Sequence, residues 1–223
     1  MQKIILSIAM LGIAIFSSSQ LANAQIGIGI KGGINFSKLT NLEWESSSYK
    51  RGALTGIIVD AKINDNFAIQ SELLYSFQGT SIDFIKNKDK NIYTYELNYI
   101  QIPLLLKLSY GDEKARIYIN GGYWLGFLIF YSNDLPYSYY SEKNDIFSFP
   151  ILEKNINKFD CGLAFSLGLT VKAGPGDFFI EGRYNHGLLD INKGEVTETP
   201  NYKPNKNMVI NFSTGYILYF GGK

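Results

Sequence analysis

Histidine, cysteine and tryptophan are scarce in this sequence. Its 223 residues include one histidine, His186, one cysteine, Cys161, and two tryptophans. A single cysteine excludes an internal disulfide, and one histidine with one cysteine leaves little from which to build a transition-metal site. The sequence therefore predicts a fold that holds together without cross-links, and we expect neither a metal nor a cofactor.

Net charge and long apolar runs are lacking as well. The 21 basic and 20 acidic residues give a formal charge of +1, so nothing in the composition favours nucleic acid as a partner. Beyond the N-terminus, no run approaches the roughly eighteen apolar residues that a membrane-spanning helix needs. A membrane protein with this sequence would have to cross the bilayer with strands.

Residues 1–24 have the pattern of a secretory signal peptide. Lys3 supplies a positive start, an apolar run extends from Ile4 to Phe16, and Ala22-Asn23-Ala24 is an A-x-A cleavage site. The apolar run is too short to span a bilayer as a helix. We expect cleavage to leave a mature chain, residues 25–223, that forms a single domain.

The mature chain is rich in aromatic residues and alternates between apolar and polar side chains. In residues 115–131, one phase is almost entirely apolar, whereas the other carries Arg116, Asn120 and Trp124. Successive side chains of a strand point to opposite faces, so this pattern predicts a long strand with one apolar face. Residues 99–110 form a matching strand, and a four-residue polar turn, Gly111 to Lys114, joins the two.

Eight segments of this kind follow one another along the chain. They are residues 26–39, 52–63, 67–79, 99–110, 115–131, 158–172, 178–189 and 207–220. The connections alternate between short turns and long polar stretches, among them a charged linker expected over residues 80–94. Outer-membrane barrels have this plan of short periplasmic turns and long external loops. In the second segment both phases are apolar, and the pattern does not assign its faces.

The sequence thus predicts an all-β fold, an eight-stranded antiparallel up-and-down transmembrane β-barrel with both chain ends in the periplasm. A soluble lipocalin-like barrel would also have eight strands, but its outer face should be polar. A lumen of eight strands is too narrow to bury all the apolar side chains, so the apolar phase is expected to face lipid.

Five stretches, taken in this order, resemble the PorT-like outer-membrane β-barrel proteins of the Bacteroidetes. They are GIKGGINFS (29–37), SELLYSFQG (71–79), YIQIPLLLK (99–107), FDCGLAFSLGL (159–169) and FFIEGRYNHGLLDI (178–191). The resemblance implies an outer-membrane location in a Gram-negative cell. The namesake of the family is tied to protein secretion across the outer membrane, and most members have no assigned activity.

Several charged residues fall in the phase that should face the lumen. Because an unpaired buried charge is costly, we expect them to pair in a polar network that fills the lumen. The candidate network residues are Glu72, Arg116, Asp160, Glu181 and Arg183. Glu96, Lys107 and Lys172 share this phase. The alternative is that some of these charges line a substrate path or form a catalytic dyad.

The connection after residue 131 is unusually rich in tyrosine. Its candidate binding residues are Tyr131, Tyr137, Tyr139 and Tyr140, and this composition is typical of binding loops. A solvated, variable loop is the alternative. His186 shares the lipid-facing phase of its segment, so we interpret it as an interfacial residue and name no catalytic residue.

We therefore expect a non-enzymatic outer-membrane protein that acts as a structural or binding protein of the envelope, or as an accessory of protein secretion. A small-solute pore and, less favoured, a lipid-modifying enzyme are the alternatives. The expected partners are outer-membrane lipid and lipopolysaccharide, the barrel-assembly machinery during biogenesis, and secretion-complex proteins.

Overall fold

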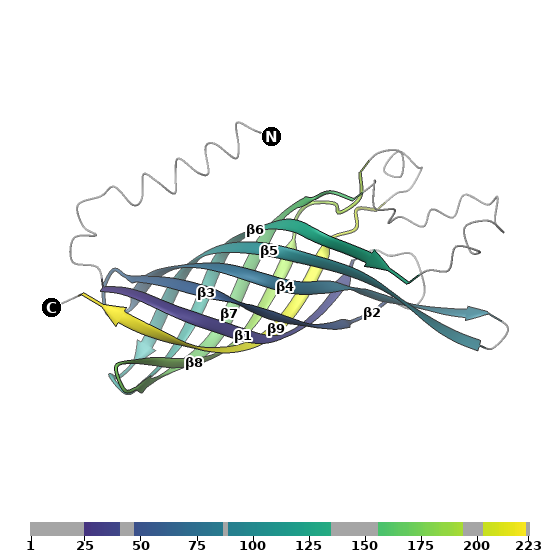
Figure 1. Cartoon of the computed structure of the whole chain (residues 1–223). Helices are drawn as coiled ribbons and strands as arrows, with labels where there is room; N and C mark the ends of the chain where they lie inside the picture. Colours follow the sequence, from purple (N-terminus) through teal and green to yellow (C-terminus); the bar gives the residue numbers. More distant parts are fainter. Residues whose placement is uncertain (1–24, 41–46, 87–88, 135–155, 194–202, 222–223) are drawn as a thin grey trace.

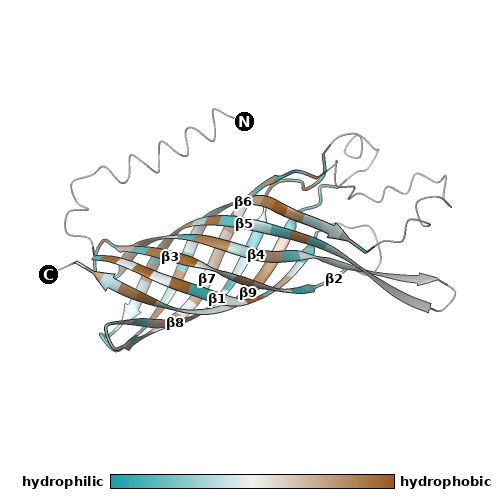
Figure 2. Ribbon diagram, viewed as in Figure 1, coloured by the Kyte–Doolittle hydropathy of each residue, from teal (hydrophilic) through white to brown (hydrophobic). Residues whose placement is uncertain are grey.

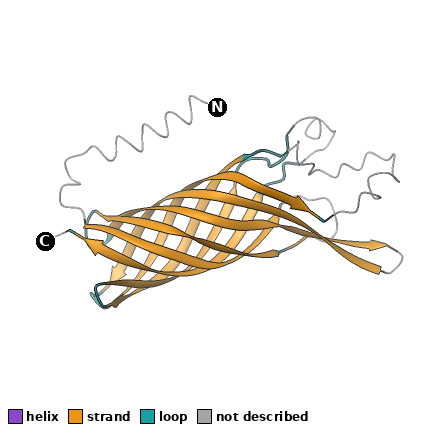
Figure 3. Cartoon of the chain, in the orientation of Figure 1, coloured by secondary structure: helices purple, strands orange, loops and turns teal. Residues whose placement is uncertain are grey.

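The computed structural model describes residues 25–40, 47–86, 89–134, 156–193 and 203–221. All of its long elements are strands (Figure 3). They are β1 (Gln25–Leu39), β2 (Ser47–Ser48), β3 (Lys50–Lys62), β4 (Phe67–Lys86), β5 (Asp89–Gly111), β6 (Ala115–Asn133), β7 (Phe159–Ala173), β8 (Gly176–Gly187) and β9 (Asn207–Phe220). Within these ranges, no helix is long and apolar enough to cross a membrane.

The eight long strands close into an antiparallel barrel. Each pairs with its neighbour in the chain, apart from the two-residue β2, which lies against β4. The first and last strands complete the ring, with Ile26 opposite Phe220 and Leu39 opposite Asn207. Closure gives each of the eight long strands two neighbours, which removes the open sheet edges that lipid cannot satisfy. The predicted eight-stranded up-and-down barrel is confirmed.

The two ends of the barrel differ, as Figure 1 shows. The turns β3–β4, β5–β6 and β7–β8 lie at the end where the described chain begins and finishes, and we call this the turn end. The opposite end, where the longer connections leave the barrel, is the loop end. In outer-membrane barrels the short turns are periplasmic and the long loops external.

The two faces of the wall separate by hydropathy, and the colours alternate along the strands in Figure 2. Leu106 and Ile30 point outward and are each 68% exposed, whereas their neighbours Lys107 and Lys31 point inward and are buried. In β3, whose faces the sequence left open, Ile57 is exposed and Ile58 is buried. The outer face is therefore an apolar belt suited to lipid, and the lumen is lined mainly by polar side chains.

The charged linker predicted over residues 80–94 is wrong. β4 and β5 instead continue as a paired ribbon, and only residues 87–88 separate the two strands. In Figure 1 this ribbon runs out beyond the barrel wall at the loop end. In a two-stranded ribbon, half of the backbone groups pair between the strands and the other half can bond to water, so the ribbon needs no apolar face once it has left the membrane. The sequence of the ribbon therefore does not alternate regularly between apolar and polar residues, and the pattern did not predict its two strands.

One proline interrupts the wall between β4 and β5. The paired register stops at Ser71 opposite Leu104 and resumes at Leu74 opposite Gln101. Pro103 lies in this gap. Proline has no N–H to donate, so the ladder of backbone hydrogen bonds is interrupted at this point. Glu72 occupies the gap on the other strand, and its side chain is the centre of the lumen network described next.

Candidate functional site

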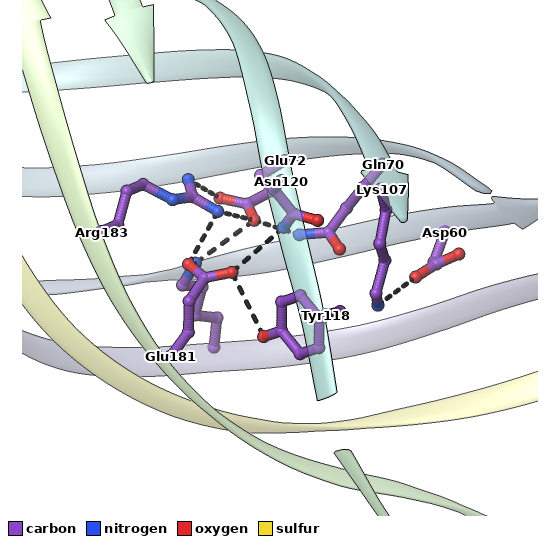
Figure 4. Close-up of polar contacts among 9 residues, drawn as sticks. Asp60, Gln70, Glu72, Lys107, Tyr118, Asn120, Glu181 and Arg183 are labelled. Atoms are coloured by element: carbon purple, nitrogen blue, oxygen red, sulfur yellow. Dashed lines mark hydrogen bonds and ion pairs between the residues drawn. The ribbon is translucent and has the colours of Figure 1, made fainter. Parts of the chain in front are cut away.

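Four charged side chains meet inside the barrel (Figure 4). Arg183 of β8 donates from Nη1 to Glu72 Oε2 of β4 at 2.8 Å and from Nη2 to Glu72 Oε1 at 2.7 Å. Lys31 of β1 donates to Glu181 Oε1 at 2.7 Å and to Glu72 Oε1 at 3.3 Å. Arg183 Nη2 is also 2.9 Å from Glu181 Oε1. We call these four residues the lumen cluster.

Neutral side chains supply further hydrogen bonds to the two carboxylates. Gln70 donates to Glu72, while Tyr118 and Asn120 each donate to Glu181 Oε2 at 3.2 Å. Two cations and two anions cancel, so the cluster carries no net charge. Buried charges are tolerated when they are paired and hydrogen-bonded in this way.

The lumen cluster leaves no room for water around its charged groups. The side chains of Lys31, Glu72 and Glu181 are 0% exposed, and that of Arg183 is 1% exposed. Apolar side chains pack in the lumen on either side, with Trp124 and Leu105 in one group and Tyr118 and Phe179 in another. The middle of the barrel is therefore filled by side chains, as expected for eight strands.

A second ion pair lies between the lumen cluster and the turn end. Lys107 donates to Asp60 Oδ2 at 2.8 Å, and its Nζ lies 4.5 Å from the centre of the Tyr118 ring. A hollow of about 20 Å³, lined in part by Asp60, Lys107, Arg116 and Tyr219, opens at this end. It has room for about one water molecule, so its size does not suit an organic substrate.

The loop end has its own polar contact inside the wall. Asp160 Oδ2 accepts a hydrogen bond from Asn207 Nδ2 at 2.8 Å, and the same amide donates to the Tyr99 hydroxyl at 3.2 Å. Apolar side chains close this end of the lumen. They are Leu39, Tyr95, Leu97, Tyr99, Ile156 and Ile191, with Leu128 and Tyr131 packed against them.

Hydrogen bonds also fix the bases of two loops at the loop end, the one between β6 and β7 and the one between β8 and β9. Asp190 Oδ1 accepts from the backbone N–H groups of Asn192 and Asn205 at 3.0 and 3.1 Å. Asn157 donates its side-chain amide to the carbonyl oxygens of Asp190 and Asn192 at 2.7 and 3.1 Å. The described loop bases thus form a connected rim that holds the loops at fixed points on the barrel.

The structure brings together three of the five candidate network residues, Glu72, Glu181 and Arg183. Arg116 lies at the turn end beside the hollow, and Asp160 bonds to Asn207 near the loop end, so neither belongs to the lumen cluster. The alternation of residues along a strand determines which side chains point into the lumen. It does not determine how far along the barrel axis each side chain lies, because that position depends on the register and shear of the strands.

Sequence reasoning missed Lys31 and Asp60 as members of charged pairs. Lys31 alternates with the apolar residues of a glycine-rich segment, and this alternation could have identified it as a lumen residue. Asp60 lies in the segment whose two faces could not be assigned from the sequence.

Two further charged residues, Glu96 and Lys172, were predicted to point into the lumen, and this prediction is wrong. Glu96 is 44% exposed beside Lys50, because its buried neighbours Tyr95 and Leu97 are the residues that point inward there. Lys172 is 49% exposed beside Asp177, because it lies near the turn end.

The remaining candidates lie outside the lumen. Tyr131 packs at the loop end, whereas Tyr137, Tyr139 and Tyr140 are outside the described residues. His186 stacks on Tyr184, with the Tyr184 hydroxyl 3.2 Å from His186 Nδ1. In the described part of the chain, no three histidine, cysteine or acidic side chains gather to hold a metal ion.

Comparison with solved structures finds the same architecture. OprG of Pseudomonas aeruginosa is 12% identical and covers 90% of this chain and 97% of its own, with a TM-score of 0.52. Ail of Yersinia pestis (13% identity, 88% and 99% covered, TM-score 0.42) and the neisserial surface protein NspA (11%, 84% and 95%, TM-score 0.46) also match. At these identities the likeness concerns the fold alone. No curated protein matches the sequence.

A family model gives the more specific result. The model described as outer membrane protein beta-barrel domain matches residues 18–193, well over half of the chain. The match agrees with the closed barrel, its apolar outer belt and its polar lumen. The chain belongs to the outer membrane protein beta-barrel domain family, and it is an integral protein of the outer membrane.

Proposed function

We propose that this protein is a non-conducting, non-enzymatic barrel of the outer membrane that acts through its loop end as a binding or structural protein of the envelope. The observation that carries the proposal is the lumen cluster, whose four charged side chains are at most 1% exposed. A solute path would need water-accessible polar side chains at this level. The polar lumen is thus explained as internal packing.

The loop end is the part best suited to meet a partner. The β4–β5 ribbon extends beyond the wall, and the rim around Asp190 fixes where the other loops begin. Loops held on a rigid scaffold are a common way to present a binding surface. The tyrosine-rich connection that contains Tyr137, Tyr139 and Tyr140 leaves from the same end, after β6, and we propose it as the contact region.

The finer role that we propose is that of an accessory of protein secretion. Its support is the sequence resemblance to PorT-like proteins, through stretches such as 99–107 and 159–169. Lipopolysaccharide around the barrel and the barrel-assembly machinery during insertion would be its other partners. A filled barrel fits an accessory role, because the secreted protein would have to cross the membrane through another component.

Site-specific cross-linking in intact cells tests this proposal. A photoreactive residue is placed at Tyr139 in the loop, and a matched one at Glu113 in the turn between β5 and β6. We expect the Tyr139 probe to give a discrete adduct with an envelope or secretion protein. Adducts from the Glu113 probe alone would contradict action through the loop end, and an unchanged profile of secreted proteins after deletion of the gene would contradict the secretion role.

A further inference from the structure

Three cations lie next to one another on the outer wall of the barrel at the loop end. Arg51 of β3 follows the outward phase of its strand and is exposed, and its partner across the ladder is Phe36 of β1. Lys38 is two residues beyond Phe36 on the same face, hence a diagonal neighbour of Arg51. Lys206 precedes β9 and pairs with Thr40, since the Thr40 N–H donates to the Lys206 carbonyl at 2.9 Å. We call Lys38, Arg51 and Lys206 the cationic row.

The cationic row has no counter-charge within the part of the chain that the structure describes. None of its members lies within ion-pair distance of a described carboxylate. By contrast, the nearby Lys50 is paired with Glu96 at 3.3 Å. Diagonal neighbours on a sheet are close enough for long side chains to interact, and adjacent like charges are unfavourable. An external anion would therefore be attracted to the row.

The wall beneath the cationic row is apolar and lies in the lipid belt. Phe36 and Phe212 pack edge to face, with ring centres 6.5 Å apart, and Ile34 is 52% exposed. Lys38 places its Nζ 4.9 Å from the centre of the Tyr49 ring, so its stem follows the wall while its charge stays at the top of the belt. A ligand seated here would have to be anionic at one end and apolar at the other.

The same three strands also carry unusually small outward side chains further down. Gly32 of β1 has Thr55 of β3 on one side and Thr214 of β9 on the other. A Cβ atom added at Gly32 would meet no atom closer than 3.9 Å. The outer surface is therefore low at Gly32, on the middle one of the neighbouring strands β9, β1 and β3 (Figure 1), and we call this place the depression. An acyl chain has room to rest there.

We infer that the cationic row and the depression below it form a seat for a phosphorylated glycolipid of the outer leaflet, of the lipopolysaccharide class. The guanidinium of Arg51 suits bidentate contact with a phosphate, and the two lysines add point charges beside it. The headgroup phosphates lie on the row and one acyl chain lies over Gly32. This deepens the proposed function, because it gives the lipopolysaccharide proposed there as a partner a site on the barrel wall, and that site is independent of any protein that the loops contact.

The first test is lipid A binding to the full-length protein in mild detergent, measured by native mass spectrometry or calorimetry. If each cation contributes about 1 kcal/mol, the triple variant K38Q/R51Q/K206Q should bind lipid A roughly 100-fold more weakly. The matched control is K158Q/K193Q/K203Q, which makes the same change in net charge at exposed loop-end lysines off the row. Equal weakening in both variants would show a general charge effect and contradict the seat.

Two further arms separate a lipid seat from a free-anion site. Replacing Gly32 by Phe should fill the depression and weaken lipid A binding, whereas Gly121→Phe, at another outward glycine on β6, should leave it unchanged. Dephosphorylated lipid A should lose most of the affinity of lipid A, and millimolar inorganic phosphate should not displace the lipid. Equal binding of the dephosphorylated lipid, or displacement by phosphate, would overturn the inference. A heat-modifiability gel shift verifies that each variant is folded.

Discussion

Arg183 donates two parallel hydrogen bonds to Glu72 across the lumen, from β8 to β4, although 111 positions separate the two residues in the chain. β4 and β8 are not neighbours in the sheet, so the pair joins opposite parts of the wall. Lys31 and Glu181 complete a neutral set around it. The same contacts thus close the lumen and stabilise the barrel.

Replacing Arg183 by Met should destabilise the barrel by about 3–5 kcal/mol, because it leaves two buried carboxylates facing a single lysine. The double variant E72Q/R183M keeps the Lys31–Glu181 pair and removes one charge of each sign, so it should be more stable than R183M. Urea unfolding in lipid vesicles, followed by the gel shift, measures both. A double variant that is less stable than R183M would contradict the assigned pairing.

Gly162 should not tolerate a side chain. A Cβ atom at this position would lie 2.0 Å from the His186 carbonyl oxygen and 2.7 Å from Trp124 Nε1. Gly162→Ala should therefore cost about 1–3 kcal/mol through overpacking. Gly121→Ala is the control, because its Cβ would meet only Phe165, at 3.7 Å. Equal stability of the two variants in the same unfolding assay would argue against the packing around Trp124.

Asp190 should keep the bases of the loops in place at the loop end. Asp190→Ala removes the acceptor of two backbone hydrogen bonds, to Asn192 and Asn205, and should destabilise these loop bases by about 1–3 kcal/mol. Hydrogen exchange in residues 188–193 and 203–207 should speed up while the strands stay protected. Asp190→Asn keeps one acceptor oxygen and serves as the control. Faster exchange throughout the barrel would instead indicate global destabilisation.

The turn between β5 and β6 should show a measurable pKa shift. The backbone N–H groups of Ala115 and Lys114 donate to Asp112 Oδ1, and these bonds hold the pKa of the Asp112 carboxyl below its ordinary value. Because the folded pKa is depressed, the contribution to stability is present above the unfolded pKa and disappears as pH falls through the folded pKa. NMR titration of the carboxyl carbon measures this. A pKa at or above about 3.9 would contradict the turn geometry.

Much of the fold follows from the sequence, because a two-residue period fixes which side chains face lipid. Ile117 and Ile119 were expected outward and are exposed, whereas Asn120 was expected inward and is buried. The ribbon of β4 and β5 escaped prediction because it lies beyond the belt, where backbone pairing alone sustains a strand. Local hydropathy carries no information on such pairing.

The candidate network was predicted less completely, since contact across a lumen depends on height as well as face. Arg116 and Asp160 point inward at the turn end and near the loop end, whereas Glu72, Glu181 and Arg183 share the middle level. Strand order alone does not give these levels; the register and shear of the closed barrel do. Lys31 joins the lumen cluster for the same reason.

Single-channel recording in a planar bilayer tests the central claim most directly, namely that the side chains of the lumen cluster close the barrel. Full-length protein, verified as folded by the gel shift, is inserted at known density, and a general porin is recorded in parallel as a positive control. The account predicts no steady conductance above the bare bilayer at either polarity. Discrete, reproducible openings that scale with the amount of folded protein would contradict it and would favour a small-solute pore.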